Sequence, residues 1–372
     1  MKITELEAIV LKAGDVDTTR ADGTQDAFLV RVHTDDGIVG VGEADTSPYL
    51  ARTVVDMPSS HSIARGLKEL LVGEDPLRIG SAWSRMFNAT YHYGRDGAAL
   101  HVMSAVDMAL WDLLGKVAAM PIAQLLGGRR CEVVDVYASE VMPETPEEVS
   151  AIARTVVQEG FHGLKLGWGP LGRDVGRDVE LASAAREILG PDRKLMIDGG
   201  MAYSLRNALE FCRRTTALDL FWFEEPFLAD DLESYRRLCD SVDIRIACGE
   251  AHSTVRPFRQ LIEAHVDVLQ PDLGRCGGIS VARDIAALAA DHSVLVVPHC
   301  FSTDVLLAAS LQFVATLDQE RLIEFPVTDS KRAGSIVQGP GFVAEHGQVA
   351  IPIGAGLGIS LDDEELSRRR VE

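Results

Sequence analysis

The sequence predicts an α/β protein in which a small α+β domain, residues 1–126, precedes a parallel β/α barrel, residues 127–330. Three observations predict this fold class. The chain has 372 residues, which suits two domains or one enlarged barrel. Its first part contains strand-like segments followed by helical ones. From about residue 131, short apolar segments alternate with stretches long enough for a helix, the pattern typical of a parallel barrel.

The first domain begins with two strand-like segments, residues 2–13 and 27–44, the second of which contains an Asp-Asp-Gly turn. The segment between them is polar and rich in turn residues, so we expect a loop over residues 14–27 that acts as a lid over the site. From residue 60 to 126 the pattern is helical, and residues 99–118 predict a long, apolar helix. Together these segments predict a small antiparallel sheet covered by helices.

The second domain contains eight short apolar segments that read as strands. Most of the gaps between them have the length and composition of a helix, which favours a barrel. An open doubly wound sheet is the alternative, but a G-x-G-x-x-G signal after its first strand is missing. The eight segments are residues 133–139, 163–167, 194–199, 220–226, 244–250, 266–272, 294–300 and 321–326.

Composition excludes several classes of partner. The formal net charge of −20 repels nucleic acid and anionic membranes, so we expect a small molecule as the partner. The six cysteines form no C-x-x-C pair and predict reduced, mostly buried thiols. The N-terminus lacks the apolar core of a signal peptide, and no apolar run approaches eighteen residues. We therefore expect a cytoplasmic protein that does not span a membrane.

Ionisable residues lie within or at the end of seven consecutive predicted strands, 22 to 33 residues apart. A charged residue after a strand is commonly a helix cap or a turn former, so any one of them alone carries little weight. Seven in succession point to the C-terminal rim of a barrel, where barrel enzymes build their sites. The seven residues are Lys165, Asp198, Glu224, Glu250, Asp272, His299 and Glu324.

The middle of this rim predicts a metal site. Asp198, Glu224 and Glu250 come from three adjacent strands, and their carboxylates would repel one another without a cation between them. Ligation by oxygen alone suits a hard ion such as Mg²⁺.

Candidate acid and base groups flank the predicted metal. Lys165 lies in an otherwise uncharged strand, where it either reaches solvent or does chemistry. Asp272 beside His299 would orient the imidazole and suit it to proton transfer. Glu324 could share a proton with an oxyanion that develops on the substrate. A carboxylate substrate bound to Mg²⁺ would lose its α-proton more easily, giving an enediolate.

These motifs resemble the enolase superfamily, specifically its mandelate racemase-like subgroup. The resemblance rests on "LKLG", "MIDGG", "FEEP", "CGE", "QPDLGRCGG", "PHC" and "IEFP", in that order along the chain. It implies a capping domain, a modified (β/α)₇β barrel and a C-terminal segment, residues 331–372, that returns to the capping domain. It also implies a homo-oligomer, either a dimer or an octamer.

The resemblance assigns roles to the seven residues. Asp198, Glu224 and Glu250 match the Mg²⁺ ligands, Asp272 and His299 match an Asp–His dyad, and Glu324 matches an electrophilic carboxylic acid. Lys165 matches the second lysine of a K-x-K motif. Gly163 replaces the first lysine, so depression of the Lys165 pKa would depend on desolvation and on the metal. Gly200 stands where the family often has Asn. Trp168 and residues 91–97 are candidates to shape the pocket.

The leading functional prediction is an Mg²⁺-dependent acid-sugar dehydratase acting on a small carboxylate. Racemisation, epimerisation and cycloisomerisation share the same enediolate, and the capping segments 14–27 and 46–60 would decide among them. A catalytically retired barrel used as a binding scaffold is the non-enzyme alternative. A metal-dependent hydrolase would need more histidines at the rim.

Overall fold

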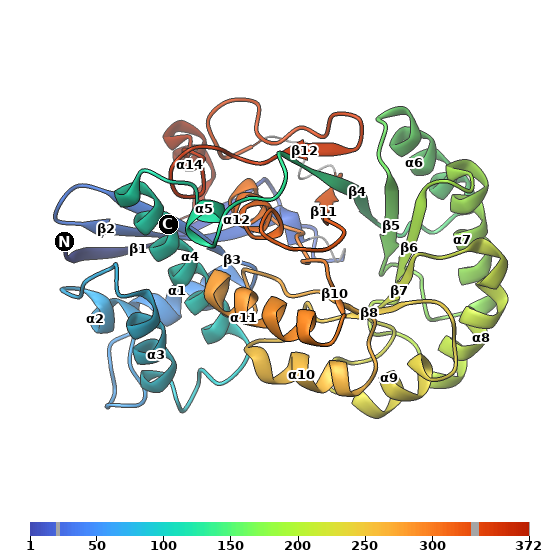
Figure 1. Cartoon of the computed structure of the whole chain (residues 1–372), viewed down its shortest axis with the longest axis horizontal. Coiled ribbons are helices and arrows are strands. Elements are labelled where there is room, and N and C mark those ends of the chain that lie inside the picture. Colours follow the sequence, from blue (N-terminus) through green and yellow to red (C-terminus); the bar gives the residue numbers. More distant parts are fainter. Residues whose placement is uncertain (20–22, 329–334, 372) are drawn as a thin grey trace.

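The computed structural model describes residues 1–19, 23–328 and 335–371. It confirms the predicted fold class: an N-terminal α+β domain packs beside a parallel β/α barrel (Figure 1). The first domain contains a four-stranded sheet of order β13-β1-β2-β3. Its first three strands pair antiparallel and are β1 (Ile3–Lys12), β2 (Asp26–Thr34) and β3 (Val39–Ala44). A short 3₁₀ turn, η1 (Gly23–Gln25), precedes β2.

Helices cover one face of this sheet, and the long helix α4 packs directly on β3. Two glycines permit this close contact. A Cβ atom on Gly40 would lie 2.1 Å from the carbonyl oxygen of Ala109, and one on Gly42 would lie 2.0 Å from that of Ala105. The helices are α1 (Pro48–Asp56), α2 (Leu67–Leu71), α3 (Ile79–Ala89), α4 (Ala98–Ala118) and α5 (Ile122–Leu125).

Helix α4 is long and apolar enough to cross a membrane, with a mean hydropathy of 1.2 over its most apolar window. However, 83% of that window is buried inside the protein. Its position between β3 and the barrel helix α11 explains its composition, because both sides of α4 contact protein.

Among the described residues of the second domain, eight parallel strands alternate with seven helices, and Figure 1 shows the helices outside the strands. All eight predicted strands are present, although several are shorter than predicted. The elements are β4 (Val133–Val141), α6 (Pro146–Gln158), β5 (Gly163–Gly167), α7 (Val175–Leu189), β6 (Lys194–Asp198), α8 (Leu205–Thr215), η2 (Thr216–Leu218), β7 (Trp222–Glu224), α9 (Leu232–Cys239), β8 (Ile246–Cys248), α10 (Val255–Glu263), β9 (Val268–Leu269), α11 (Gly278–Asp291), β10 (Leu295–Val296), α12 (Asp304–Val314) and β11 (Leu322–Pro326).

The strand order β11-β4-β5-β6-β7-β8-β9-β10 brings the last strand beside the first. Within the described residues, no strand ladder joins β10 to β11. Instead, the backbone N–H of Cys300, which follows β10, donates to Oε2 of Glu324 on β11 at 3.0 Å. The side chain of Gln319, just before β11, also bonds the backbone of Val296 on β10. Side chains therefore join the two ends of the sheet, and one of them, Glu324, belongs to the predicted site.

The C-terminal segment contacts both domains. Strand β12 (Gln348–Ala350) pairs antiparallel with β4 of the barrel, and β13 (Arg370–Val371) pairs with β1 after the helix α14 (Asp363–Arg369). The C-terminus therefore lies beside the first sheet (Figure 1).

Buried polar groups hold the N-terminal domain on the barrel. Glu43 on β3 is fully buried and accepts hydrogen bonds from the hydroxyls of Ser302 and Thr303 and from the N–H of Leu306, near the start of α12. Asp107 on α4 accepts from the N–H and the hydroxyl of Ser280 at the start of α11. These contacts fix the position of the N-terminal domain over the carboxyl ends of the strands.

All six cysteines are free thiols, four of them buried and two partly buried, as the spacing predicts.

Candidate active site

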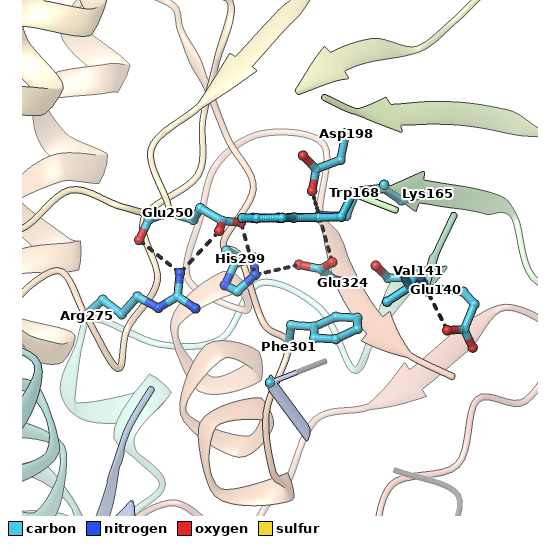
Figure 2. Close-up of a pocket in the computed structure, with 13 residues that line it drawn as sticks. Glu140, Val141, Lys165, Trp168, Asp198, Glu250, Arg275, His299, Phe301 and Glu324 are labelled. Atoms are coloured by element: carbon cyan, nitrogen blue, oxygen red, sulfur yellow. Dashed lines mark hydrogen bonds and ion pairs between the residues drawn. The ribbon is translucent and has the colours of Figure 1, made fainter. Parts of the chain in front are cut away.

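A cavity of about 290 Å³ opens at the carboxyl ends of the barrel strands (Figure 2). Five of the seven predicted site residues line it: Lys165, Asp198, Glu250, His299 and Glu324. The other two are buried and contact members of this set. Glu224 bonds Lys165, and Asp272 bonds His299.

The three predicted metal ligands converge. Oxygen atoms of Asp198, Glu224 and Glu250 lie within 4.8 Å of one another, and all three residues are buried. Asp198 and Glu224 are the last residues of β6 and β7, where adjacent parallel strands place them side by side. Glu250 follows β8 by two residues.

The electrostatics of these carboxylates suit a bound cation. Burial and the neighbouring Glu224 raise the pKa of Asp198 well above its usual value, and burial also raises the pKa of Glu224. Burial acts the same way on Glu250, but His299 and Arg275 outweigh it and lower the pKa of that group. Since a cation would relieve the repulsion and all the donors are oxygens, the three carboxylates fit Mg²⁺.

Lys165 is buried among carboxylates rather than directed to solvent. Only 3% of the residue is exposed. Its ammonium nitrogen lies 2.6 Å from Oε1 of Glu224, 2.8 Å from Oε1 of Glu324 and 3.9 Å from Oδ2 of Asp198. Burial favours the neutral amine, but Glu224 and Glu324 outweigh it and hold the pKa of Lys165 well above its usual value. Desolvation therefore does not depress this pKa in the structure.

Gly163, which stands where the motif has its first lysine, lies close to the neighbouring strands. Gly163 lies two residues before Lys165 on β5, so the two positions share one face of the sheet. A Cβ atom there would lie 3.0 Å from the carbonyl oxygen of Lys194 and 3.3 Å from Cβ of Tyr137. A side chain at position 163 would therefore require these neighbours to shift by a few tenths of an ångström.

His299 lies on the other side of the carboxylates, oriented by Asp272. Its Nδ1 is 2.6 Å from Oδ2 of Asp272, and its Nε2 is 3.1 Å from Oε2 of Glu250. Burial disfavours the imidazolium, but Glu250, Glu324 and Asp272 together raise the pKa of His299 to about 10. Asp272 fixes Nδ1, so Nε2, which contacts Glu250, is the nitrogen that would transfer a proton.

Glu324 lies between the lysine and the histidine. Besides its contact with Lys165, its Oε2 is 3.9 Å from Nε2 of His299. Burial favours the protonated acid, yet Lys165 and His299 outweigh it and lower the pKa of Glu324 to about 2. Glu324 is therefore a carboxylate in this state and would need a proton before it could act as an acid.

Sequence reasoning missed an ion pair at the site between Arg275 and Asp45. Arg275 lines the cavity, with its guanidinium 2.7 Å from Oδ2 of Asp45 and 3.3 Å from Oε1 of Glu250. Asp45 directly follows β3, so this arginine links the N-terminal domain to a predicted metal ligand. The signal was present: Arg275 belongs to "QPDLGRCGG", and Asp45 is an acid at the end of a strand.

Of the two expected capping segments, one contributes a residue to the cavity and the other contains a helix. Gly23 from the predicted lid lines the cavity, whereas residues 20–22 of that segment lie outside the described residues. The segment 46–60 is not a loop throughout, because α1 occupies residues 48–56. Trp168 lines the cavity as expected, but none of residues 91–97 does so.

Two family models match the chain. Residues 16–127 match the N-terminal domain of mandelate racemase / muconate lactonizing enzyme, and residues 148–366 match the enolase C-terminal domain-like family. Together these matches cover both domains seen in the structure.

Curated relatives act on acid sugars or their lactones. The D-galactarolactone cycloisomerase of Agrobacterium fabrum is 34% identical over 356 residues, which cover 92% of this chain and 91% of that protein. The L-rhamnonate dehydratase of Saccharopolyspora erythraea is 31% identical over 356 residues, which cover 92% of this chain and 85% of that protein.

Solved structures match the whole fold. The 3,6-anhydro-D-galactonate cycloisomerase from Zobellia galactanivorans superposes with a TM-score of 0.90, 28% identity and full coverage of both chains. A racemase from Streptomyces coelicolor with bound magnesium superposes with a TM-score of 0.87 and 28% identity, covering 99% of this chain and all of that one.

Proposed function

This chain belongs to the mandelate racemase / muconate lactonizing enzyme family of the enolase superfamily, and from that premise we propose that it removes the α-proton of an acid sugar with the help of Mg²⁺. The observation that carries the proposal is the convergence of three buried carboxylates with Lys165 on one side and His299 on the other. The racemase that superposes with a TM-score of 0.87 holds magnesium.

Asp198, Glu224 and Glu250 are the residues that would hold the ion. When bound, Mg²⁺ supplies positive charge that acidifies the α-proton of a carboxylate and stabilises the enediolate. The protein prepares the site by burying the three carboxylates and by fixing two of them. Trp222 donates its indole N–H to Oε2 of Glu224 at 2.9 Å, and the N–H of Gly200 donates to Oδ1 of Asp198 at 2.9 Å.

His299 is the acid/base group in this proposal, because Asp272 fixes its Nδ1 and leaves Nε2 toward the cavity. Because the pKa of His299 is about 10 beside Glu250, Nε2 must first lose its proton, which positive charge held by Glu250 would favour. The neutral Nε2 then takes the α-proton of the substrate and returns a proton to the leaving oxygen. Lys165 is the cationic stabiliser, because its ammonium already contacts two carboxylates inside the barrel. Glu324, between them, is ionised in this state, and once protonated it would share that proton with the developing oxyanion.

Dehydration is the leading reaction. The Cα–H bond breaks with transfer of the proton to His299, and the bond from Cβ to its hydroxyl then breaks with protonation of the departing oxygen. One water molecule leaves, and the enol product tautomerises to a 2-keto-3-deoxy acid. The similarity to L-rhamnonate dehydratase supports this outcome.

Cycloisomerisation is the second candidate, supported by the similarity to D-galactarolactone cycloisomerase at 34% identity. Here a ring oxygen on Cβ leaves in place of hydroxide. The ring opens, the departing oxygen stays on the molecule, and no water is lost. Racemisation or epimerisation would instead return the proton to the opposite face of Cα.

The test is a screen of acid sugars with Mg²⁺ in D₂O. Each acid is followed by ¹H NMR for exchange of the α-proton and by colorimetry for a 2-keto product. The panel includes two ring/open-chain pairs: D-galactarolactone with galactarate, and 3,6-anhydro-D-galactonate with D-galactonate. We expect Mg²⁺-dependent exchange that EDTA abolishes. No exchange with any acid, while the acids still bind, would favour a scaffold over an enzyme.

We also propose that the enzyme is a cytoplasmic homo-oligomer. Six free thiols suit a reducing compartment. Light scattering of the purified protein would measure the oligomeric state, and a monomeric mass would contradict the proposal.

A further inference from the structure

Trp168 differs from the other tryptophans of this chain, which has four. Trp83, Trp111 and Trp222 each donate the indole N–H to a protein acceptor at 2.9 to 3.0 Å. The indole of Trp168, by contrast, has no hydrogen-bond partner and no aromatic neighbour among the described residues, although it lines the active-site cavity. Since a tryptophan usually finds a partner for its N–H, this side chain has an unused donor.

The backbone holds Trp168 in an unfavourable conformation. Its φ angle is +60°, in the left-handed region that non-glycine residues rarely adopt. The glycines on both sides are required by close packing. A Cβ atom on Gly167 would lie 2.4 Å from Cβ of Asp198, and one on Gly169 would lie 2.2 Å from the carbonyl oxygen of Met142. Strain of this kind collects at functional sites, where the surrounding structure maintains it.

Gly200 leaves the space that the indole occupies. Gly200 has a φ of +55°, and a Cβ atom there would lie 3.1 Å from Cδ2 and 3.2 Å from Cγ of Trp168. The ring therefore packs over the backbone of Gly200, two residues beyond the predicted metal ligand Asp198. The absence of a side chain at this position makes room for the aromatic one.

A second aromatic residue lines the same cavity. Phe301 follows His299 by two residues, and the centroids of the two rings are 6.5 Å apart. Figure 2 shows the indole of Trp168 edge-on, with the carboxyl group of Glu324 between it and the ring of Phe301 in this view. At about 290 Å³ the cavity is at the small end of the range for ligand pockets, so a ligand in it meets these rings.

We propose that Trp168 is the platform for the face of a ring-shaped acid sugar, which makes a cyclic acid the preferred ligand over an open-chain one. A sugar or lactone ring has a face of C–H groups that packs on an aromatic face, and a hydroxyl that extends past the edge of the indole can accept from its in-plane N–H. An open chain directs hydroxyls to all sides, so some would lie unpaired against the indole. This inference rests on the proposed function, because the proposed function gives the position of the ligand's carboxylate in the cavity.

The test compares the dissociation constants of the two ring/open-chain pairs by calorimetry, with Mg²⁺ present. In the wild type we expect the ring acid of at least one pair to bind more tightly than its open-chain partner. Trp168→Ala should weaken binding of that ring acid about ten- to hundredfold, the range for the apolar area of one buried side chain, and that of the open acid less than about threefold. Trp168→Phe should keep part of the preference. Trp83→Phe, which removes an indole N–H outside the cavity, is the matched control.

Gly200→Asn provides a second route to the same result, because asparagine tolerates a positive φ while its side chain would displace the indole. In the wild-type background, Gly200→Asn should reduce the preference for the ring acid over the open acid. In the Trp168→Ala background it should not change that preference further, as a double-mutant cycle would show. Equal weakening of both acids, a wild-type preference for the open acids, or additive effects of the two substitutions would overturn the inference. Ring binding that depends on Trp168 without α-proton exchange would overturn the proposed function alone.

Discussion

Replacing Lys165 by methionine tests the electrostatics of the site, because it removes the charge and keeps an unbranched side chain. The ammonium lies 2.6 Å from Glu224 and 2.8 Å from Glu324, and both carboxylates are fully buried. Removing one partner of a buried ion pair typically costs about 3–5 kcal/mol, because a buried charge is left uncompensated. In EDTA, we therefore expect the free energy of unfolding to fall by about that amount.

Mg²⁺ should restore part of this loss, because a cation at the three carboxylates replaces the missing positive charge. The denaturation midpoint of Lys165→Met should therefore rise more on addition of Mg²⁺ than that of the wild type. Urea denaturation with and without Mg²⁺, followed by circular dichroism, measures both quantities. Arg177→Met, which alters an exposed ion pair with Glu180, is the control and should change stability by less than about 1 kcal/mol. Wild-type stability of Lys165→Met in EDTA would refute the reasoning.

Three further predictions follow from particular contacts. His299→Asn should lower kcat by about 10²–10⁴-fold and abolish α-proton exchange, as measured by NMR, while calorimetry still detects Mg²⁺ binding. Exchange that survives in His299→Asn and vanishes in Lys165→Met would make Lys165 the base. Asp198→Asn should weaken Mg²⁺ binding by at least about tenfold in equilibrium dialysis, and unchanged affinity would place the ion elsewhere. Burial, with Arg275 nearby, lowers the pKa of His101 from its usual value of 6.5 to about 4. The folded protein therefore favours neutral His101, and the stability that this contributes above pH 6.5 should be lost as the pH falls toward 4. His101→Phe should flatten that part of a plot of unfolding free energy against pH, and an unchanged slope would contradict the assignment.

The positions of the seven site residues could be predicted because a barrel repeats one unit. Each strand and helix returns the chain to the same rim, so residues such as Asp198 and Glu224 at successive strand ends must lie side by side. The candidate metal site was predicted from that register and from the cost of placing like charges together. Neither step required knowledge of contacts between distant segments.

The contacts that sequence reasoning missed join segments far apart in the chain. Arg275 meets Asp45 across 230 residues, and no periodic pattern relates a strand of the N-terminal domain to a loop of the barrel. The pairing of Lys165 with Glu324 also depends on barrel closure, which brings β11 next to β4. This pairing raises the pKa of Lys165, whereas desolvation alone would lower it. Predicting that effect required the distances between the ammonium and the carboxylates.

A crystal structure of the protein grown with Mg²⁺ tests the central claim most directly. The account predicts one ion with oxygens of Asp198, Glu224 and Glu250 at about 2.0–2.1 Å from it, and Lys165 and His299 on opposite sides. A second group of potential ligands, Asp45, Asp272 and His299, lies nearby. An ion at that second group, or ordered carboxylates of the first group without an ion, would contradict the account.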